Sequence, residues 1–261
     1  MSRLTTTSAG QERVLAAVGY FSHALHHLIA AAPWIALQTR LSLVSRIKQY
    51  KAHHEHEKAV AATTPPAQQP ATPPLLALSA LCSETRYTLR LFGLIPLWRW
   101  GEQTLRNPPK DPYIHAITVV QVLANTVYQV LENGGFLASK GVVSKRFVDR
   151  WGGIDKWYLW SVRAWFSHII LQLGILWRQY VLRKNRAAAA TAAGGEKGED
   201  AETQRLEIRA WRKSLMNCVF WAPLALHWSV EQGVGVPGNL TGIGGFMAGS
   251  WGFWDLWAAT A

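Results

Sequence analysis

The sequence predicts an all-α, membrane-associated helical bundle with amphipathic helices and one to three transmembrane or membrane-embedded helices. Charged residues make up only 16% of the 261 residues and hydrophobic residues 49%, whereas a soluble domain carries about 25% charge. The chain also contains 14 tryptophans, and the indole ring is favoured at the headgroup level of a bilayer. The alternative is a soluble core rich in large aromatic residues. Long uncharged segments favour the membrane.

Composition divides the chain into five regions. Proline-rich and alanine/glycine-rich stretches cannot form a packed core, so they separate the helical regions. The predicted regions are an N-terminal helical region (1–60), a proline-rich flexible loop (61–74), central amphipathic and membrane helices (75–186), a low-complexity linker (187–204) and C-terminal membrane-anchoring helices (205–261).

The N-terminal region begins with a helix over Val14–Ala32, whose apolar residues recur at steps of three and four and form one face. This pattern is typical of a helix that packs on protein or lies on lipid. Pro33 favours a break, and Trp34–Tyr50 is predicted to form a second helix.

The central region begins with an arginine-rich and aromatic segment over Leu75–Arg106. Such a helix is typical of a membrane surface, where basic side chains meet anionic headgroups and apolar ones enter the acyl boundary. Gly93 and Pro96 predict a kink and therefore two short pieces. An ordinary core helix with solvated arginines is the alternative. The predicted membrane-binding residues are Arg86, Leu89, Arg90, Phe92, Ile95, Trp98, Arg99 and Arg106.

Two longer helices follow. Asp111-Pro112 is an N-cap signal before the uncharged run Tyr113–Leu131. Within this run a polar seam at four-residue steps is expected to face other helices, and Glu132–Gly135 is expected to end the helix. The seam consists of Gln121, Asn125 and Gln129. The next helix, Trp157–Leu182, is either a short span bracketed by Arg163 and Arg178 or a helix buried at the membrane surface.

The C-terminal region contains Ser214–Val230, interrupted by Pro223, and the uncharged run Gly233–Trp254, which is the best transmembrane candidate by length and charge. Four glycines share one face of this second segment as two GxxxG units, which allows close approach of another helix and favours oligomer contact. They are Gly238, Gly242, Gly245 and Gly249. A flexible glycine-rich loop is the alternative.

The net charge of +11 suits either nucleic acid or anionic lipid headgroups. The basic residues lie beside apolar runs and not along one stripe with stacking aromatics, so we expect lipid and no nucleic acid. No nucleotide-binding glycine loop, zinc-protease motif or nucleophile elbow is present, and we predict no enzyme activity and no cofactor. The spacings of His23/His26/His27 and His53/His54/His56 could hold a metal, but neither set has a cysteine or carboxylate constellation. We predict no metal site.

The order of these pieces resembles the peroxin-11 (peroxisomal biogenesis factor 11) family, in a divergent fungal-like form. The resemblance covers most of the chain except the two low-complexity segments. It lies in Gly10–Tyr20, in Ser83–Leu105, in Leu131-Glu132-Asn133 with Gly141-Val142-Val143, in Trp160–Trp165, and in Asn217–Ser229 with the glycine-rich end. Pro96 and the two insertions depart from the family pattern.

The resemblance implies a protein of the peroxisomal membrane that promotes elongation, proliferation and fission of peroxisomes. It further implies insertion of amphipathic helices, self-association into homo-oligomers and recruitment of fission machinery, namely a dynamin-like GTPase and its adaptor. Two alternatives stay open: a small-metabolite channel, which the polar seam would suit, and a non-catalytic membrane scaffold.

Overall fold

The computed structural model describes residues 7–31, 72–192 and 200–258. Every regular element in these ranges is an α-helix, which confirms the predicted fold class. They are α2 (Ser8–Ala31), α4 (Pro74–Arg90), α5 (Leu94–Arg106), α6 (Pro112–Ser139), α7 (Lys145–Arg150), α8 (Gly153–Ala192), α9 (Asp200–Ser229) and α10 (Gly238–Ala258). The predicted helix Trp34–Tyr50, the break at Pro33, the second histidine set and most of the proline-rich loop lie outside the described residues.

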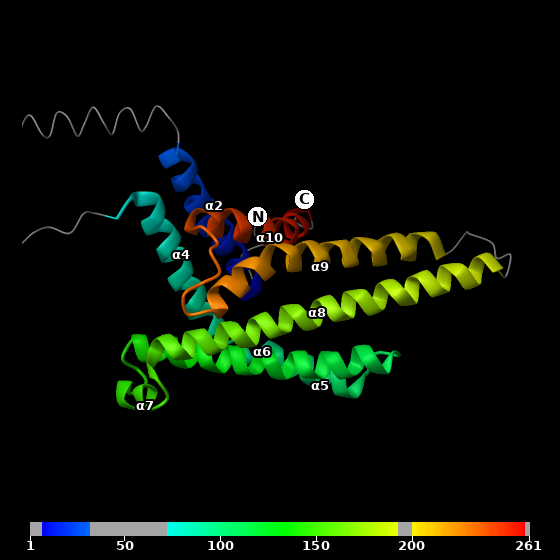
Figure 1. Ribbon diagram of the computed structural model, residues 1–261, viewed down its shortest axis with the longest axis horizontal. Helices are drawn as coiled ribbons and strands as arrows, with labels where there is room; N and C mark the ends of the chain where they lie inside the picture. Colours follow the sequence, from blue (N-terminus) through cyan, green and yellow to red (C-terminus); the bar gives the residue numbers. More distant parts are fainter. Residues whose placement is uncertain (1–6, 32–71, 193–199, 259–261) are drawn as a thin grey trace, which may run out of the picture.

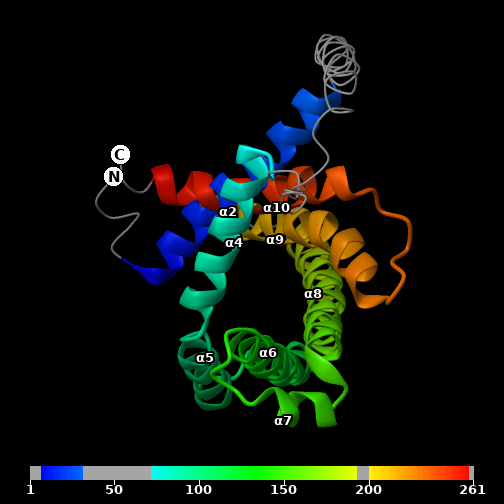
Figure 2. The same ribbon diagram turned by 90° about the vertical axis from the view of Figure 1, so that its left-hand side faces the viewer.

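The helices form a long layer crossed by a shorter group. α6 and α8 pack side by side along the long axis, with α5 beside α6 and α9 beside α8 (Figure 1). α2 and α4 pack on each other and run steeply across this axis, and α10 packs on both α2 and α9. Figure 2 shows α6 and α8 nearly end-on, with α4 joining the two parts.

The start of α6 follows the sequence prediction, but its end does not. Asp111 Oδ1 accepts hydrogen bonds from the backbone N–H groups of Tyr113 (3.1 Å) and Ile114 (3.0 Å), as expected of an N-cap. The helix then continues through Gly134 and Gly135 to Ser139. Side chains at these two glycines would meet the rings of Trp157 and Tyr158, so close packing on α8 outweighs their low helix propensity.

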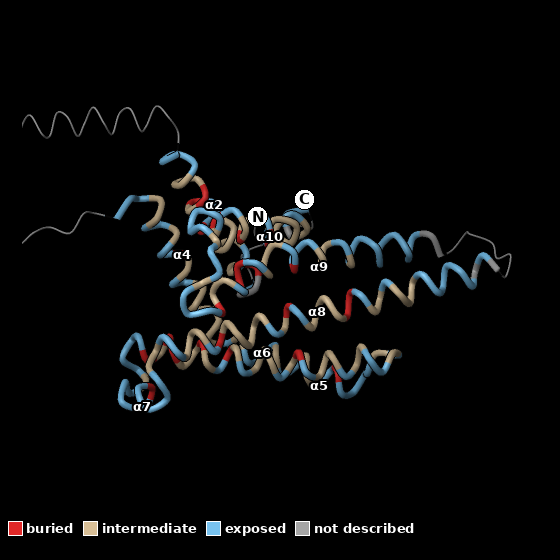
Figure 3. The backbone as a smooth tube through the Cα atoms, viewed as in Figure 1, coloured by how far each residue is buried: buried red, intermediate tan, exposed pale blue. Residues whose placement is uncertain are grey.

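The buried core joins α8 to α9. Ile169 and Leu176 of α8 pack with Cys218 and Ala225 of α9, and aromatic side chains surround them. α9 runs continuously through Pro223, since packing of the flanking residues offsets the hydrogen bond that proline removes. The stretch 187–204 is helical at both ends, because α8 reaches Ala192 and α9 begins at Asp200. Much of α5 and the outer sides of α6 and α8 stay exposed (Figure 3).

Three of the described helices are long and apolar enough to cross a bilayer: α2 over Gly10–Ala31, α6, and α8 over Gly153–Ala189. Gly233–Trp254 is the best transmembrane candidate by length and charge, but α10, which forms most of it, is not among these three helices. Its length of 21 residues suffices for about 30 Å. Glycines and indoles, however, make it less apolar than an aliphatic span.

Candidate membrane interface

α5 exposes an apolar strip to its surroundings. Leu94, Trp98 and Leu105 fall within about 40° of one another on the helix, at 100° per residue. Trp98 is 77% exposed, Leu105 68% and Leu94 37%. Ile95 adjoins the strip, and the exposed side chain of Phe92 precedes it. We call these five residues the α5 apolar strip.

The adjoining side of α5 rests on α6 and α8. Thr104 is buried there, and an added Cβ at Gly101 would lie 3.1 Å from Val122 of α6. The Trp100 ring meets His168 of α8 edge-on, with centroids 6.3 Å apart. α5 therefore packs through a narrow side that contains Trp100, Gly101 and Thr104 and leaves the α5 apolar strip exposed, which is unfavourable in water and favourable against lipid.

The turn between α4 and α5, residues 91–93, is held by two amides of α6, and we call it the elbow. Gln129 Nε2 donates to the carbonyl of Arg90 (2.9 Å), and Asn133 Nδ2 donates to the carbonyl of Leu91 (3.2 Å). The last carbonyls of a helix have no partner within the helix, so α6 supplies partners for the end of α4. A Cβ at Gly93 would lie 2.5 Å from Gln129 Oε1, which only glycine avoids.

The polar seam of α6 faces other helices, as predicted. Gln121 is 1% exposed and Gln129 5%. Gln121 Nε2 donates to the His168 carbonyl (3.3 Å) and to Gln172 Oε1 (3.0 Å) on α8. Asn125 Nδ2 donates to the Gln121 carbonyl of its own helix. These amide groups are occupied by contacts within the protein.

An internal ion-pair cluster joins α2, α4 and α6. Arg90 Nη1 donates to Glu132 Oε1 (2.8 Å) and to the Tyr128 hydroxyl (2.6 Å). The Tyr128 hydroxyl in turn donates to Glu132 Oε1 (2.9 Å). Glu12 of α2 lies 3.3 Å from both Arg90 Nε and Arg86 Nη2. The cluster therefore ties the N-terminal helix to the centre of the molecule.

Arg86 and Arg90 thus lie inside the protein and do not form a headgroup-facing surface with the other predicted residues. Burial disfavours the charge of Arg90, yet Tyr128, Glu132 and Glu12 together raise its pKa above the ordinary value, so it stays protonated. The predicted position of both arginines at the membrane is wrong, because a basic residue among apolar ones gives the same pattern whether it meets a phosphate or a buried carboxylate.

The remaining predicted membrane-binding residues lie where lipid could reach them, with one exception. Leu89 is half-buried on α4. Arg99 is exposed, and Arg106 is exposed beside Glu102, with which it forms an i,i+4 pair at 2.7 Å. Both arginines lie next to the α5 apolar strip, on the side away from α6, so the predicted amphipathic surface is α5 with the elbow and not the whole arginine-rich segment.

The glycine face of α10 is partly used within the chain. A Cβ at Gly242 would lie 2.6 Å from the backbone nitrogen of Ala24, and one at Gly245 would lie 2.6 Å from the Tyr20 ring, both on α2. Gly238 and Gly249 have open space around them. The predicted close helix packing is present at two of the four glycines, and its partner there is α2 of the same chain and not a second copy.

Histidines of α2 contact one another, with the rings of His23 and His26 packed on His27. In the part of the chain that the structure describes, no three His, Cys, Asp or Glu side chains gather around a common point that could hold a metal ion.

Comparison with known proteins identifies the family. The family model of peroxisomal biogenesis factor 11 (PEX11) matches residues 45–257, well over half of the chain. The chain belongs to the PEX11 family. It is also 28% identical over 172 residues to the uncharacterized protein C1F12.04c of Schizosaccharomyces pombe, a match that covers 66% of this chain and 70% of that protein. No solved structure matches.

PEX11 membership makes this a peroxisomal membrane protein with a role in peroxisome biogenesis and proliferation. PEX11 proteins are biogenesis factors and not a known enzyme family. The three apolar helices α2, α6 and α8 agree with a membrane location.

The sequence predicted a break near Gly93, but not the α6 amides that hold the elbow and not the ion-pair cluster. A signal for the elbow was present, because Gln129 and Asn133 lie four residues apart on the same face of α6 and thus can act together. Arg90 and Glu132 are 42 residues apart in the sequence. No sequence signal links them, since their pairing depends on how α4 meets α6.

Proposed function

We propose that this protein promotes the elongation, constriction and fission of peroxisomes by inserting the α5 apolar strip into one leaflet of the membrane. The observation that carries the proposal is the outward exposure of Leu94, Trp98 and Leu105 on a helix whose adjoining side is held against α6. Apolar side chains of this size, placed at the acyl boundary with Arg99 and Arg106 at the headgroups, enlarge one leaflet relative to the other. That area difference favours curvature.

Self-association and recruitment of fission machinery, namely a dynamin-like GTPase and its adaptor, belong to the same proposal. Support for self-association comes from Gly238 and Gly249, the two ends of the glycine face of α10 that α2 leaves open and that another helix could approach closely. Recruitment rests on the family resemblance.

A metabolite channel has less support. The amides that would line it, Gln121 and Gln129, are buried and hydrogen-bonded to α8 and to the elbow. Groups held in this way do not offer hydrogen bonds to a passing solute. No other feature of the described residues favours the channel over membrane remodelling.

The test is reconstitution of the full chain into vesicles that contain anionic phospholipid, with electron microscopy to count tubules. The double variant Leu94→Gln/Trp98→Gln removes the apolar strip at two exposed positions, so it is expected to fold normally and to form few or no tubules. Leu206→Gln is the control, because Leu206 is 60% exposed on α9, a helix that is separated from α5 by α8 and α6 (Figure 1).

Equal tubulation by the wild-type chain and the double variant would contradict the proposal. Release of a small trapped solute from vesicles that stay spherical would favour the channel instead. Circular dichroism of each variant checks that the helices are intact.

A further inference from the structure

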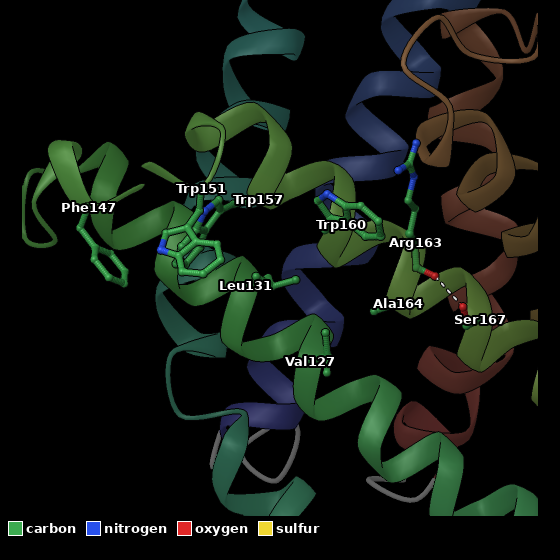
Figure 4. Close-up of a pocket in the computed structure, with 9 residues that line it drawn as sticks. All are labelled: Val127, Leu131, Phe147, Trp151, Trp157, Trp160, Arg163, Ala164 and Ser167. Carbon is green, nitrogen blue, oxygen red and sulfur yellow. Dashed lines mark hydrogen bonds between the residues drawn. The ribbon is translucent and has the colours of Figure 1, made fainter. Parts of the chain in front are cut away.

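A second surface feature, independent of α5, lies where α6, α7 and α8 meet. It is an apolar groove of about 650 Å³, within the size range of small-molecule and lipid sites. Its main walls are Val127 and Leu131 of α6, Phe147 of α7, and Trp151, Trp157 and Trp160. We call it the α6–α8 groove. Figure 4 shows the aromatic rings gathered at its α7 end and the rest of the groove running along α8 to Ala164 and Ser167.

Specific contacts between α6, α7 and α8 fix the walls of the groove. The Trp157 ring rests on Gly134 of α6, where any side chain would collide with it. Phe147 meets the Trp157 ring edge-on, with centroids 6.0 Å apart. Val148, the next residue along, is fully buried and anchors α7. Three separate elements therefore hold the aromatic end in place.

The aromatic and aliphatic walls are also open to the surroundings. Trp151 is 69% exposed, Trp160 56%, Phe147 51% and Val127 50%. The groove lies between two helices that are apolar enough to cross a bilayer. Large apolar side chains left exposed on both sides of a concave surface indicate an apolar occupant. The shape, extended along α8, suits an acyl chain.

The charged side chains around the groove indicate that the occupant also carries a negatively charged group. Lys145, Arg146 and Arg150 of α7 are exposed beside the aromatic end, and none forms an ion pair with a described residue. Residues 145–156 contain four basic and two acidic residues, so this end is positive. Arg163 at the other end is already used, because its Nε donates to the Ser229 carbonyl (2.9 Å) and its guanidinium covers the Trp160 ring. In Figure 4 that guanidinium points away from Val127 and Leu131.

We infer that the α6–α8 groove binds one anionic glycerophospholipid, with an acyl chain against the tryptophans and the phosphate at the basic residues of α7. Aromatic rings at headgroup level and basic residues beside them are the usual protein partners of such a lipid. This site does not depend on the proposed insertion of α5, from which it is separated by α6. A bound lipid would also hold α7 against the α6–α8 pair.

The experiment is native mass spectrometry of the full chain in mild detergent, with phosphatidylserine, phosphatidylcholine or a free fatty acid added in turn. The wild-type chain is expected to retain one phosphatidylserine and much less phosphatidylcholine. Ala164→Trp, which fills the groove, is expected to lose the retained lipid. Ala116→Trp is the control, since Ala116 is exposed on α6 and does not line the groove.

A second variant keeps the test valid if Ala164→Trp fails to fold. Lys145→Gln/Arg146→Gln/Arg150→Gln changes only exposed side chains and is expected to lower retention of phosphatidylserine on the order of 100-fold while leaving phosphatidylcholine unchanged. Its control neutralises Arg183, Lys184 and Arg186 near the other end of α8. Equal retention by this triple variant and the wild-type chain would overturn the headgroup assignment.

Two further outcomes would overturn the inference as a whole. Equal retention of the fatty acid and the phospholipid would show that the groove has no phosphate site. Dimers that form through the groove and persist without lipid would show that a second copy of the chain occupies it. Loss of tubulation in the α5 double variant with normal lipid retention would leave the groove assignment intact, so the two proposals fail separately.

Discussion

The internal position of Arg90 gives the sharpest test of the structure. Arg90→Met removes the positive partner of Glu132, whose side chain is only 8% exposed, and leaves that carboxylate buried beside Tyr128. Breaking one side of a buried ion pair costs about 3–5 kcal/mol, because the remaining charge is uncompensated. Glu12 keeps Arg86 as a partner, so the loss falls mainly on Glu132. At about 2–4 °C per kcal/mol for a chain of this size, the unfolding midpoint should fall by roughly 6–20 °C.

The assay is thermal unfolding of the full chain in detergent, followed by circular dichroism, together with sedimentation of the chain with anionic vesicles. Arg99→Met is the matched control, since Arg99 is exposed and forms no ion pair with a described residue. The double variant Arg90→Met/Glu132→Leu should recover much of the lost stability. An Arg90→Met chain with unchanged unfolding but weakened vesicle binding would refute the internal assignment and restore Arg90 to the headgroup surface.

Three other predictions follow from the described contacts. Gly245→Ala should lower the unfolding midpoint because its Cβ would lie 2.6 Å from the Tyr20 ring, whereas Gly249→Ala, in open space, should not, and equal midpoints would contradict the α2–α10 packing. Cys82 and Cys218 should react with maleimide only after unfolding, as measured by mass shift, since both are buried and burial raises the thiol pKa, that of Cys218 to about 11. Hydrogen bonds from Arg178 and from the backbone N–H groups of the cap lower the pKa of Asp111 below its ordinary value of 3.8. The contribution of Asp111 to the free energy of unfolding is therefore present above pH 3.8 and lost as the pH falls through the lowered value. Asp111→Asn should remove this pH dependence, which thermal unfolding between about pH 2 and pH 5 would measure.

Local signals in the sequence were sufficient for the start of α6 and for the division of the amphipathic segment, whereas α2, α8 and α9 begin earlier than predicted. The Asp111 cap and the elbow around Gly93 follow from residue chemistry within a few positions, so they could be predicted. The ends of α6 and the continuity of α9 could not. Gly134, Gly135 and Pro223 are each unfavourable in an isolated helix, and only packing on neighbouring helices makes them acceptable there.

The exposed side of α5 could be predicted from the sequence, whereas the partners of the arginines and of the α10 glycines could not. Periodicity on α5 is a local property, and it identified Trp98 and Ile95 as outward-facing. The partners of Arg86, Arg90 and the α10 glycines lie tens to hundreds of residues away in the chain. A sequence pattern predicts that a small or charged residue needs a close neighbour, but not whether that neighbour is lipid, a second copy or another helix of the same chain.

The arrangement of α5 and α6 constrains how any membrane insertion would act. α5 has 13 residues, about 20 Å at 1.5 Å per residue, and it lies beside the first half of the longer α6 (Figure 1). If α6 and α8 cross the bilayer, α5 extends through only one leaflet of a membrane about 40–45 Å thick with its headgroups. If α6 and α8 instead lie along the surface, α5 lies in that same leaflet, because it runs parallel to them. In both placements the α5 apolar strip adds cross-section to one leaflet alone, so the asymmetry that bends a membrane follows from helix length and packing and does not require α5 to detach from α6.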